Sequence, residues 1–132
     1  MHAFLNIAAR ILMSQIFITS GYEKIAGYAG TVKYMASLGL PGFLVPLVIL
    51  LELGGGLALL FGFKTRWAAL ALAGFSLLTG LMVHLHPGDQ MQMINFMKNL
   101  AMAGGLLMFV RHGAGAPSID VGAEARATEV RP

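Results

Sequence analysis

The chain is 132 residues long, 57% hydrophobic and only 11% charged, whereas soluble globular proteins carry about 25% charged residues. This composition excludes an ordinary water-soluble domain and indicates a membrane protein, so the lipid bilayer is the first expected partner. Cysteine is absent, which excludes disulfides, thiol redox chemistry and thiolate metal sites, and the net charge of +3 comes from scattered single Lys and Arg residues, which predicts no nucleic-acid binding.

An apolar stretch over residues 4–25 predicts the first transmembrane helix. Arg10 interrupts this stretch and no A-x-A cleavage site follows it, so we do not interpret it as a signal peptide. On a helical wheel its polar and small residues form two nearly opposite stripes, and we expect the helix to contact partners on both sides. One stripe holds Arg10, Ser14, Gly21 and Lys24, and the other holds Gln15, Thr19 and Glu23.

Residues 27–42 are too short and too polar to cross a bilayer. Apolar residues recur there at helical spacing and two tyrosines would suit the headgroup level, so we predict a short interfacial helix. The second transmembrane helix is predicted over residues 43–63, an apolar run with one carboxylate, Glu52. A carboxylate inside a bilayer is energetically costly, so we expect it to face protein or water and to have a partner.

Two further transmembrane helices are predicted over residues 67–86 and 91–110. The turn between the second and third spans is very short, which makes these spans antiparallel neighbours. The sequence therefore predicts an all-α integral membrane four-helix bundle over residues 1–112, with the short interfacial helix between spans one and two. Residues 113–132 are rich in Gly, Ala and isolated charges, and we predict that they form a mobile polar tail.

The distribution of Lys and Arg predicts the orientation in the membrane. Cytoplasmic segments of membrane proteins are enriched in these residues, and the side that holds both termini has more of them. We therefore expect both termini in the cytoplasm. That side holds Arg10, Lys64, Arg66, Arg111, Arg126 and Arg131, and the other holds Lys24, Lys33 and Lys98.

Depth along the helices suggests which cation neutralises Glu52. At about 1.5 Å per residue, Glu52 lies roughly 13 Å and Lys98 roughly 10 Å below the outer face of the membrane. Lys98 is therefore the first predicted partner in a structural ion pair, and Arg10, whose long side chain could approach from the inner side, is the second. Glycines in these helices would let a neighbouring helix or a flat ligand come close. They are Gly55, Gly56, Gly104 and Gly105.

Polar groups from several spans are expected at similar depth, where they would form a polar site that opens toward the outer leaflet. A quinone headgroup needs hydrogen-bond donors to its two carbonyls and a nearby proton carrier, which Lys, His and Asn can supply. The alternative is that Glu52 and its partner only fix the pairing of helices. The predicted ligand-binding residues are Lys24, Glu52, His84, Lys98 and Asn99.

No metal site and no intrinsic cofactor are predicted. His84 and His86 are two residues apart, so on a helix they diverge by about 200° and do not chelate one ion together. They also supply no axial haem pair from facing helices. Met91, Met93 and Met97 do not share one helical face, and methionine is common as filler in apolar helices.

An ordered set of short motifs resembles the DoxX family of small bacterial membrane proteins, over nearly the whole chain to Asp120. The last motif, at residues 113–120, departs from the family pattern at Ala114, Ala116 and Pro117. The resemblance implies a four-helix, multi-pass protein of the bacterial cytoplasmic (inner) membrane. The motifs are Arg10, S-G-x-x-K at 20–24, M-A-S-L-G-L-P at 35–41, E-x-G-G-G-L-A-L-L-x-G at 52–62, Thr65-Arg66, His84, K-N-L-A-x-x-G-G-L-L at 98–107 and G-x-G-x-x-S-x-D at 113–120.

The resemblance also implies a link to redox chemistry. Relatives in the family include a subunit of thiosulfate:quinone oxidoreductase and proteins linked to quinone and oxidative-stress resistance. We therefore expect a redox-associated subunit that binds a quinone or similar aromatic, although the family alone does not establish an enzyme. The alternative is a non-catalytic scaffold or assembly factor that recruits a soluble oxidoreductase. Small-solute transport is the weaker interpretation, since four spans make a thin wall and a pathway would require a homo-oligomer.

Overall fold

The chain folds into helices with no strand in the described part, residues 1–131 of this computed structural model. Four helices are long and apolar enough to cross a membrane, which confirms the predicted fold class. Their bounds lie within a few residues of the predicted spans, and the short interfacial helix is present between the first two. The four spans are His2–Ala26, Leu44–Phe61, Thr65–His84 and Gln90–His112.

Two of the spans are not uniform α-helices. The second and third each contain one π-helical segment, in which the backbone hydrogen bonds run one residue further than in an α-helix. The elements in chain order are α1 (His2–Ala26), α2 (Tyr28–Ser37), α3 (Leu44–Ile49), η1 (Leu50–Gly54), α4 (Gly55–Phe61), α5 (Thr65–Thr79), η2 (Gly80–His84), α6 (Gln90–His112) and α7 (Ile119–Glu129).

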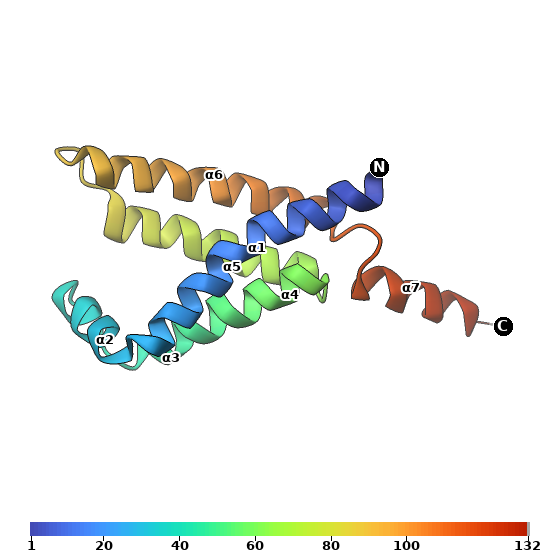
Figure 1. Ribbon diagram of the computed structural model, residues 1–132, viewed down its shortest axis with the longest axis horizontal. Coiled ribbons are helices and arrows are strands. Elements are labelled where there is room, and N and C mark those ends of the chain that lie inside the picture. Colours follow the sequence, from blue (N-terminus) through green and yellow to red (C-terminus); the bar gives the residue numbers. More distant parts are fainter. Residues whose placement is uncertain (132) are drawn as a thin grey trace.

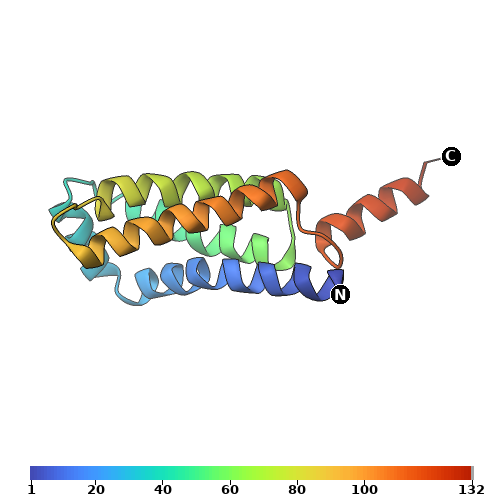
Figure 2. The same cartoon turned by 90° about the horizontal axis from the view of Figure 1, so that it is seen from above.

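The spans are arranged as two pairs. α5 packs along α6, and α1 packs along the second span, α3–η1–α4 (Figures 1 and 2). The two pairs meet near the end of the bundle that holds the N-terminus and diverge toward the end that carries α2 (Figure 1). We call these the inner end and the outer end, after the predicted orientation.

A small apolar core holds the two pairs together at their meeting point. Its side chains come from all four spans, and most other large apolar side chains point outward, as expected for a protein surrounded by lipid. Trp67, for example, is 74% exposed near the inner end of α5. The buried core residues are Phe17, Leu59, Ala69, Leu72, Ala73 and Leu106.

The first part of the C-terminal segment lies on the bundle, unlike the mobile polar tail that was predicted over residues 113–132. Residues 113–120 hydrogen-bond to α1 and to the turn between α4 and α5, so the predicted boundary at residue 113 is wrong for this stretch. The low apolar content of this segment did not predict its contacts with the bundle, because these contacts are made by backbone and polar groups rather than by apolar surface. α7 then projects away from the bundle at the inner end (Figure 1).

Candidate functional site

α1 and the second span cross at a very close contact. Gly21 lies against Leu53, and a Cβ on Gly21 would come within 3.0 Å of the Leu53 backbone nitrogen. Gly56 lies against Ile18 in the same way, where a Cβ would come within 2.9 Å of the Ile18 side chain. Such small residues let helices approach closely in membranes. The crossing places the outer part of α1 directly beside Glu52.

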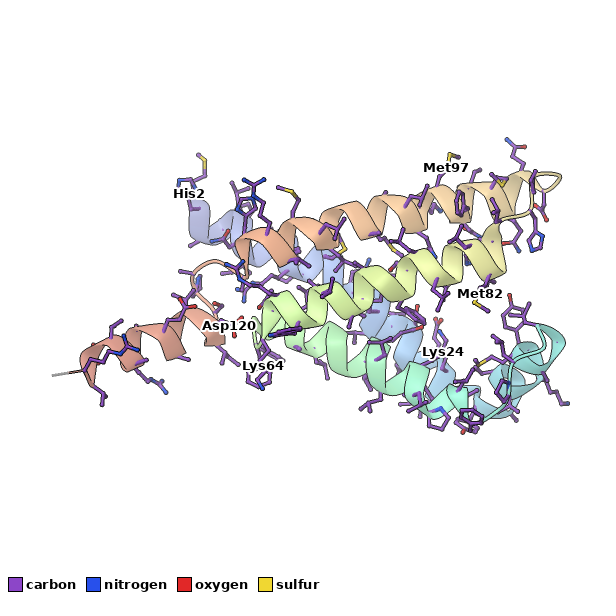
Figure 3. All side chains as sticks on the ribbon, turned by 180° about the vertical axis from the view of Figure 1, so that it is seen from behind. His2, Lys24, Lys64, Met82, Met97 and Asp120 are labelled. Carbon is purple, nitrogen blue, oxygen red and sulfur yellow. The ribbon has the colours of Figure 1, made fainter. Side chains whose placement is uncertain are left out.

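Lys24, one turn after Gly21 on α1, forms the ion pair with Glu52. Its Nζ lies 3.0 Å from Oε1 and 3.1 Å from Oε2 of the carboxylate. Glu52 is only 3% exposed, so this contact is its main compensation for leaving water. Figure 3 shows Lys24 at the divergence between the two helix pairs.

The predicted partners of Glu52, Lys98 first and Arg10 second, are therefore wrong. The prediction counted depth along straight and parallel helices, whereas the crossing at Gly21 tilts α1 over the second span. This tilt brings Lys24 to the level of Glu52, although Lys24 is close to the end of its helix.

Arg10 takes a different role at the inner end. Its guanidinium donates hydrogen bonds to the backbone oxygens of Asn6, at 3.4 Å, and of Pro117. The side chain is buried, and it ties α1 to the C-terminal segment rather than to the middle of the second span. The predicted stripe that holds Arg10 is thus on the buried face of α1. The residues of the opposite stripe, Gln15, Thr19 and Glu23, are exposed.

The predicted packing glycines have different outcomes. Gly56 lies against α1, and Gly55 against Leu72 of α5, so the space beside Glu52 on this face is filled by neighbouring helices and not by a ligand. Gly105 faces the end of the Met13 side chain. Gly104 has nothing near its Cβ position and is exposed, so the predicted packing role is wrong there.

The five predicted ligand-binding residues do line one cavity, of about 490 Å³, in the outer half of the bundle. The cavity lies where the two helix pairs diverge, and α2 covers part of it with Thr31, Tyr34 and Met35. Most of the remaining wall is apolar, as in ligand pockets that hold a ring by shape and orient it by a few polar groups. The five residues are Lys24, Glu52, His84, Lys98 and Asn99.

Both π-helical segments contribute to this cavity. η1 carries Glu52 and η2 carries His84, and both side chains are part of the wall. A π-helical turn changes the direction of the residues around it, and such turns are frequent at functional sites. Sequence patterns did not indicate either segment, because the apolar periodicity of a span hardly changes over a single wider turn.

Hydrogen bonds fix the polar groups between α5 and α6. Asn99 Nδ2 donates to the backbone oxygen of Ser76 and to Oγ1 of Thr79, each at 3.0 Å. Thr79 Oγ1 in turn donates to the backbone oxygen of Phe75 at 2.9 Å. Ser76 also lines the cavity, and its buried Oγ has no hydrogen-bond partner among the described residues.

His84 and Lys98 complete the polar wall. Nδ1 of His84 lies 2.7 Å from Oε1 of Gln92, near the start of α6. Lys98, two turns further along α6, is exposed and forms no ion pair within residues 1–131. Sequence reasoning missed Ser76, Thr79 and Gln92, since single polar residues on apolar helices carry no spacing signal until their neighbours are known.

A second polar cluster closes the inner end of the bundle. Asp120 accepts hydrogen bonds from the backbone nitrogens of Lys64, at 2.7 Å, and Thr65, at 2.9 Å, and so caps the start of α5. The Asp120 nitrogen donates to the backbone oxygen of Gly62 at 2.9 Å. We call this cluster of Arg10, Gly62, Lys64, Thr65 and Asp120 the inner clasp (Figure 3 shows Asp120 beside Lys64).

The inner clasp shifts the ionisation of Asp120. Partial burial alone would raise the pKa of this carboxyl. The hydrogen bonds from Thr65 and Lys64, together with the nearby charge of Arg10, outweigh the effect of burial and hold the pKa below its usual value. The ionised form of Asp120 is thus part of the folded state.

The comparisons with known proteins agree with this architecture. The DoxX family model matches residues 5–85. The chain is 55% identical over 114 residues to inner membrane protein YqjF of Escherichia coli (strain K12), covering 86% of this chain and 88% of YqjF. It is 37% identical over 123 residues to inner membrane protein YphA of the same strain, covering 88% of each.

A third relative is more distant. The chain is 34% identical over 61 residues to the protein named "Putative oxidoreductase CatD" of Bacillus subtilis (strain 168), which covers 46% of each chain. No solved structure matches significantly. The family model covers more than half of the chain, and the first relative is similar over most of its length. This four-span protein therefore belongs to the DoxX family.

Proposed function

We propose that the outer cavity binds a quinone or a similar aromatic ring, and that the protein acts as a redox-associated subunit of the bacterial inner membrane. The observation that carries the proposal is the convergence of polar residues from all four spans on one mainly apolar cavity. Its volume of about 490 Å³ lies within the roughly 300–1,000 Å³ of small-molecule pockets. The relative CatD, with oxidoreductase in its name, supports a redox context.

The side chains around the cavity suit an aromatic ring with oxygen substituents. Phe17, Phe75 and Met102 supply apolar contact surface for a ring. Lys98 supplies a cationic donor for a ring oxygen, while the Lys24–Glu52 pair supplies fixed charges at the opposite wall. Any redox chemistry would reside in the bound ring or in a partner subunit, and this chain would bind and orient the ring.

Binding of a quinone by the purified protein tests the proposal. Naphthoquinone should bind to wild type, and Lys98→Met should weaken binding by about tenfold or more, since a hydrogen bond from a charged donor contributes about 1.5–3 kcal/mol. Lys33→Met is the matched control, because Lys33 is exposed on α2 and does not line the cavity. No binding of the quinone or of its reduced form to wild type, or equal binding to wild type and Lys98→Met, would contradict the proposal.

A second candidate function is recruitment of a soluble oxidoreductase by the inner end. It is favoured by α7, which projects from the bundle (Figure 1) and exposes Glu124, Arg126 and Glu129. Deletion of residues 123–132 leaves the inner clasp in place and removes most of α7. If this function is correct, a co-purifying oxidoreductase activity should be lost on deletion while quinone binding stays unchanged. Retention of that activity by the shortened protein would exclude α7 as the docking element.

A further inference from the structure

The contact between His84 and Gln92 indicates which nitrogen of the imidazole carries the proton. Oε1 of Gln92 is an amide oxygen, which only accepts hydrogen bonds. At 2.7 Å it requires a hydrogen on Nδ1 of His84. In the neutral ring, Nε2 is then left with a lone pair and no hydrogen. His84 therefore offers an acceptor at the cavity wall, not a donor.

The same part of the wall has few other free donors. Both amide hydrogens of Asn99 are used on Ser76 and Thr79, and the Thr79 hydroxyl is used on Phe75. Asn99 thus keeps only its Oδ1 acceptor for a ligand. From the sequence we expected donors to the quinone carbonyls among Lys, His and Asn side chains, and in this arrangement His84 and Asn99 do not supply them.

Free donors lie further along α6. Lys98 and Asn95 both line the cavity, and neither side chain forms a hydrogen bond or ion pair in the part of the chain that the structure describes. A ring that spans the cavity therefore meets an acceptor at η2 and donors on α6. A quinone carbonyl at η2 would place one lone pair against another, whereas a hydroxyl there would donate to Nε2.

We propose that the cavity is selective for the reduced, hydroxyl-bearing form of the ring, a hydroquinone or phenol, whose hydroxyl donates to Nε2 of His84 while another ring oxygen accepts from Lys98 or Asn95. The inference rests on the proposed function, since it concerns the same cavity. It assigns His84 as the residue that distinguishes the two redox forms of the ligand and Gln92 as the positioning residue that sets its tautomer. It involves binding only and no electron transfer.

The test compares naphthohydroquinone with naphthoquinone under anaerobic conditions, with purified full-length protein. Wild type should bind the hydroquinone at least about tenfold more tightly, because Nε2 of His84 has no hydrogen bond when the bound ring covers it with a carbonyl. His84→Phe should abolish this difference between the two forms. Gln92→Leu should reduce it, since this change removes the acceptor that holds the hydrogen on Nδ1.

The outcomes separate this inference from the proposed function. Equal binding of the two forms to wild type, or tighter binding of the quinone, would overturn the inference and leave quinone binding intact. Failure of both forms to bind would overturn both. Unchanged discrimination in His84→Phe would show that another group reads the redox state, and would also overturn the inference.

A spectroscopic measurement keeps the assignment testable if a variant fails to fold. Nitrogen NMR of histidine-labelled wild type at pH about 8 should show one imidazole with hydrogen on Nδ1 and none on Nε2, and naphthohydroquinone should shift its Nε2 resonance. Gln92→Leu should change the tautomer ratio of that ring. A ring with its hydrogen on Nε2 in wild type would contradict the proposal.

Discussion

At the scale of single residues, the Lys24–Glu52 pair is asymmetric. Glu52 is 3% exposed, whereas the Lys24 side chain is 28% exposed and lies in the last turn of α1, at the outer end of the bundle. If Glu52 loses its charge, Lys24 can extend toward water along its flexible stem. If Lys24 loses its charge, the carboxylate has no comparable route and remains in an apolar surrounding.

The two single substitutions should therefore differ in their effect on stability. Lys24→Met is expected to lower the free energy of unfolding by about 3 kcal/mol, and Glu52→Gln by about 1 kcal/mol. Detergent unfolding of both variants and of the double variant would measure these values and their coupling. Lys33→Met, an exposed lysine without an ion pair among the described residues, should change stability by less than about 0.5 kcal/mol. Equal losses from both single substitutions would contradict the asymmetry.

Asp120 gives the protein a pH-dependent contribution at its inner end. Its pKa is lowered in the folded state, so the ionised carboxylate stabilises the fold above its unfolded pKa of about 4, and this contribution is lost as the pH falls through the lower folded pKa. Asp120→Asn should lower stability by about 1 kcal/mol near neutral pH, the usual effect of losing a helix cap.

The measurement for Asp120 is thermal unfolding of wild type and Asp120→Asn as a function of pH. The difference in Tm should be constant from about pH 7 to about pH 5 and should shrink below about pH 4. Glu129→Gln is the control, because Glu129 lies exposed at the end of α7. A difference between wild type and Asp120→Asn that grows on acidification would show that another group is responsible.

At the scale of elements, glycines decide how the helices end and cross. Gly62 ends α4 in the left-handed conformation, at φ +68°, and a Cβ there would collide with Arg10 and Ser118. Gly21 has a different role, because its backbone is helical and its small size allows the contact with Leu53. Gly62 is thus needed for its backbone conformation, and Gly21 is needed because it has no side chain.

Substitution of Gly62 by alanine should therefore disturb the inner clasp. The left-handed conformation alone costs an alanine about 1–2 kcal/mol, and displacement of Arg10 adds to this loss. Gly74→Ala is the matched control, since Gly74 is exposed within α5 and has open space at its Cβ position. Thermal unfolding should show a lower Tm for Gly62→Ala and an equal or slightly higher Tm for Gly74→Ala. Equal Tm values for wild type and Gly62→Ala would argue against a tight clasp.

The sequence was sufficient for the elements but not for their crossings. Hydropathy and span length predicted four helices and an interfacial helix, because burial in lipid imposes long apolar runs. The convergence of Lys24, Glu52 and His84 was also predictable, since all three lie in the outer part of their spans. The partner of Glu52 was not predictable from depth, because the tilt of α1 depends on the close contacts that Gly21 makes with Leu53 and Gly56 makes with Ile18.

At the scale of the whole molecule, the two polar clusters lie at opposite ends of the bundle. The inner clasp joins the α4–α5 turn, the start of α1 and residues 113–120, so both ends of the four-span segment are at one end of the bundle. The cavity lies in the outer half, under α2. A ligand would thus enter from one face of the membrane, and a partner that binds α7 would approach from the other.

This arrangement makes the orientation in the membrane a test of the side from which a ligand reaches the cavity. The chain has no cysteine, so single cysteines can be introduced at chosen positions without background labelling. Ser37, at the end of α2, and Glu129, at the end of α7, are both exposed and lie at opposite ends of the molecule. In intact cells, a membrane-impermeant maleimide should label Ser37→Cys and should label Glu129→Cys only after the inner membrane is permeabilised. The reverse pattern would place the cavity toward the cytoplasm, and the ligand would then have to come from the cytoplasmic leaflet.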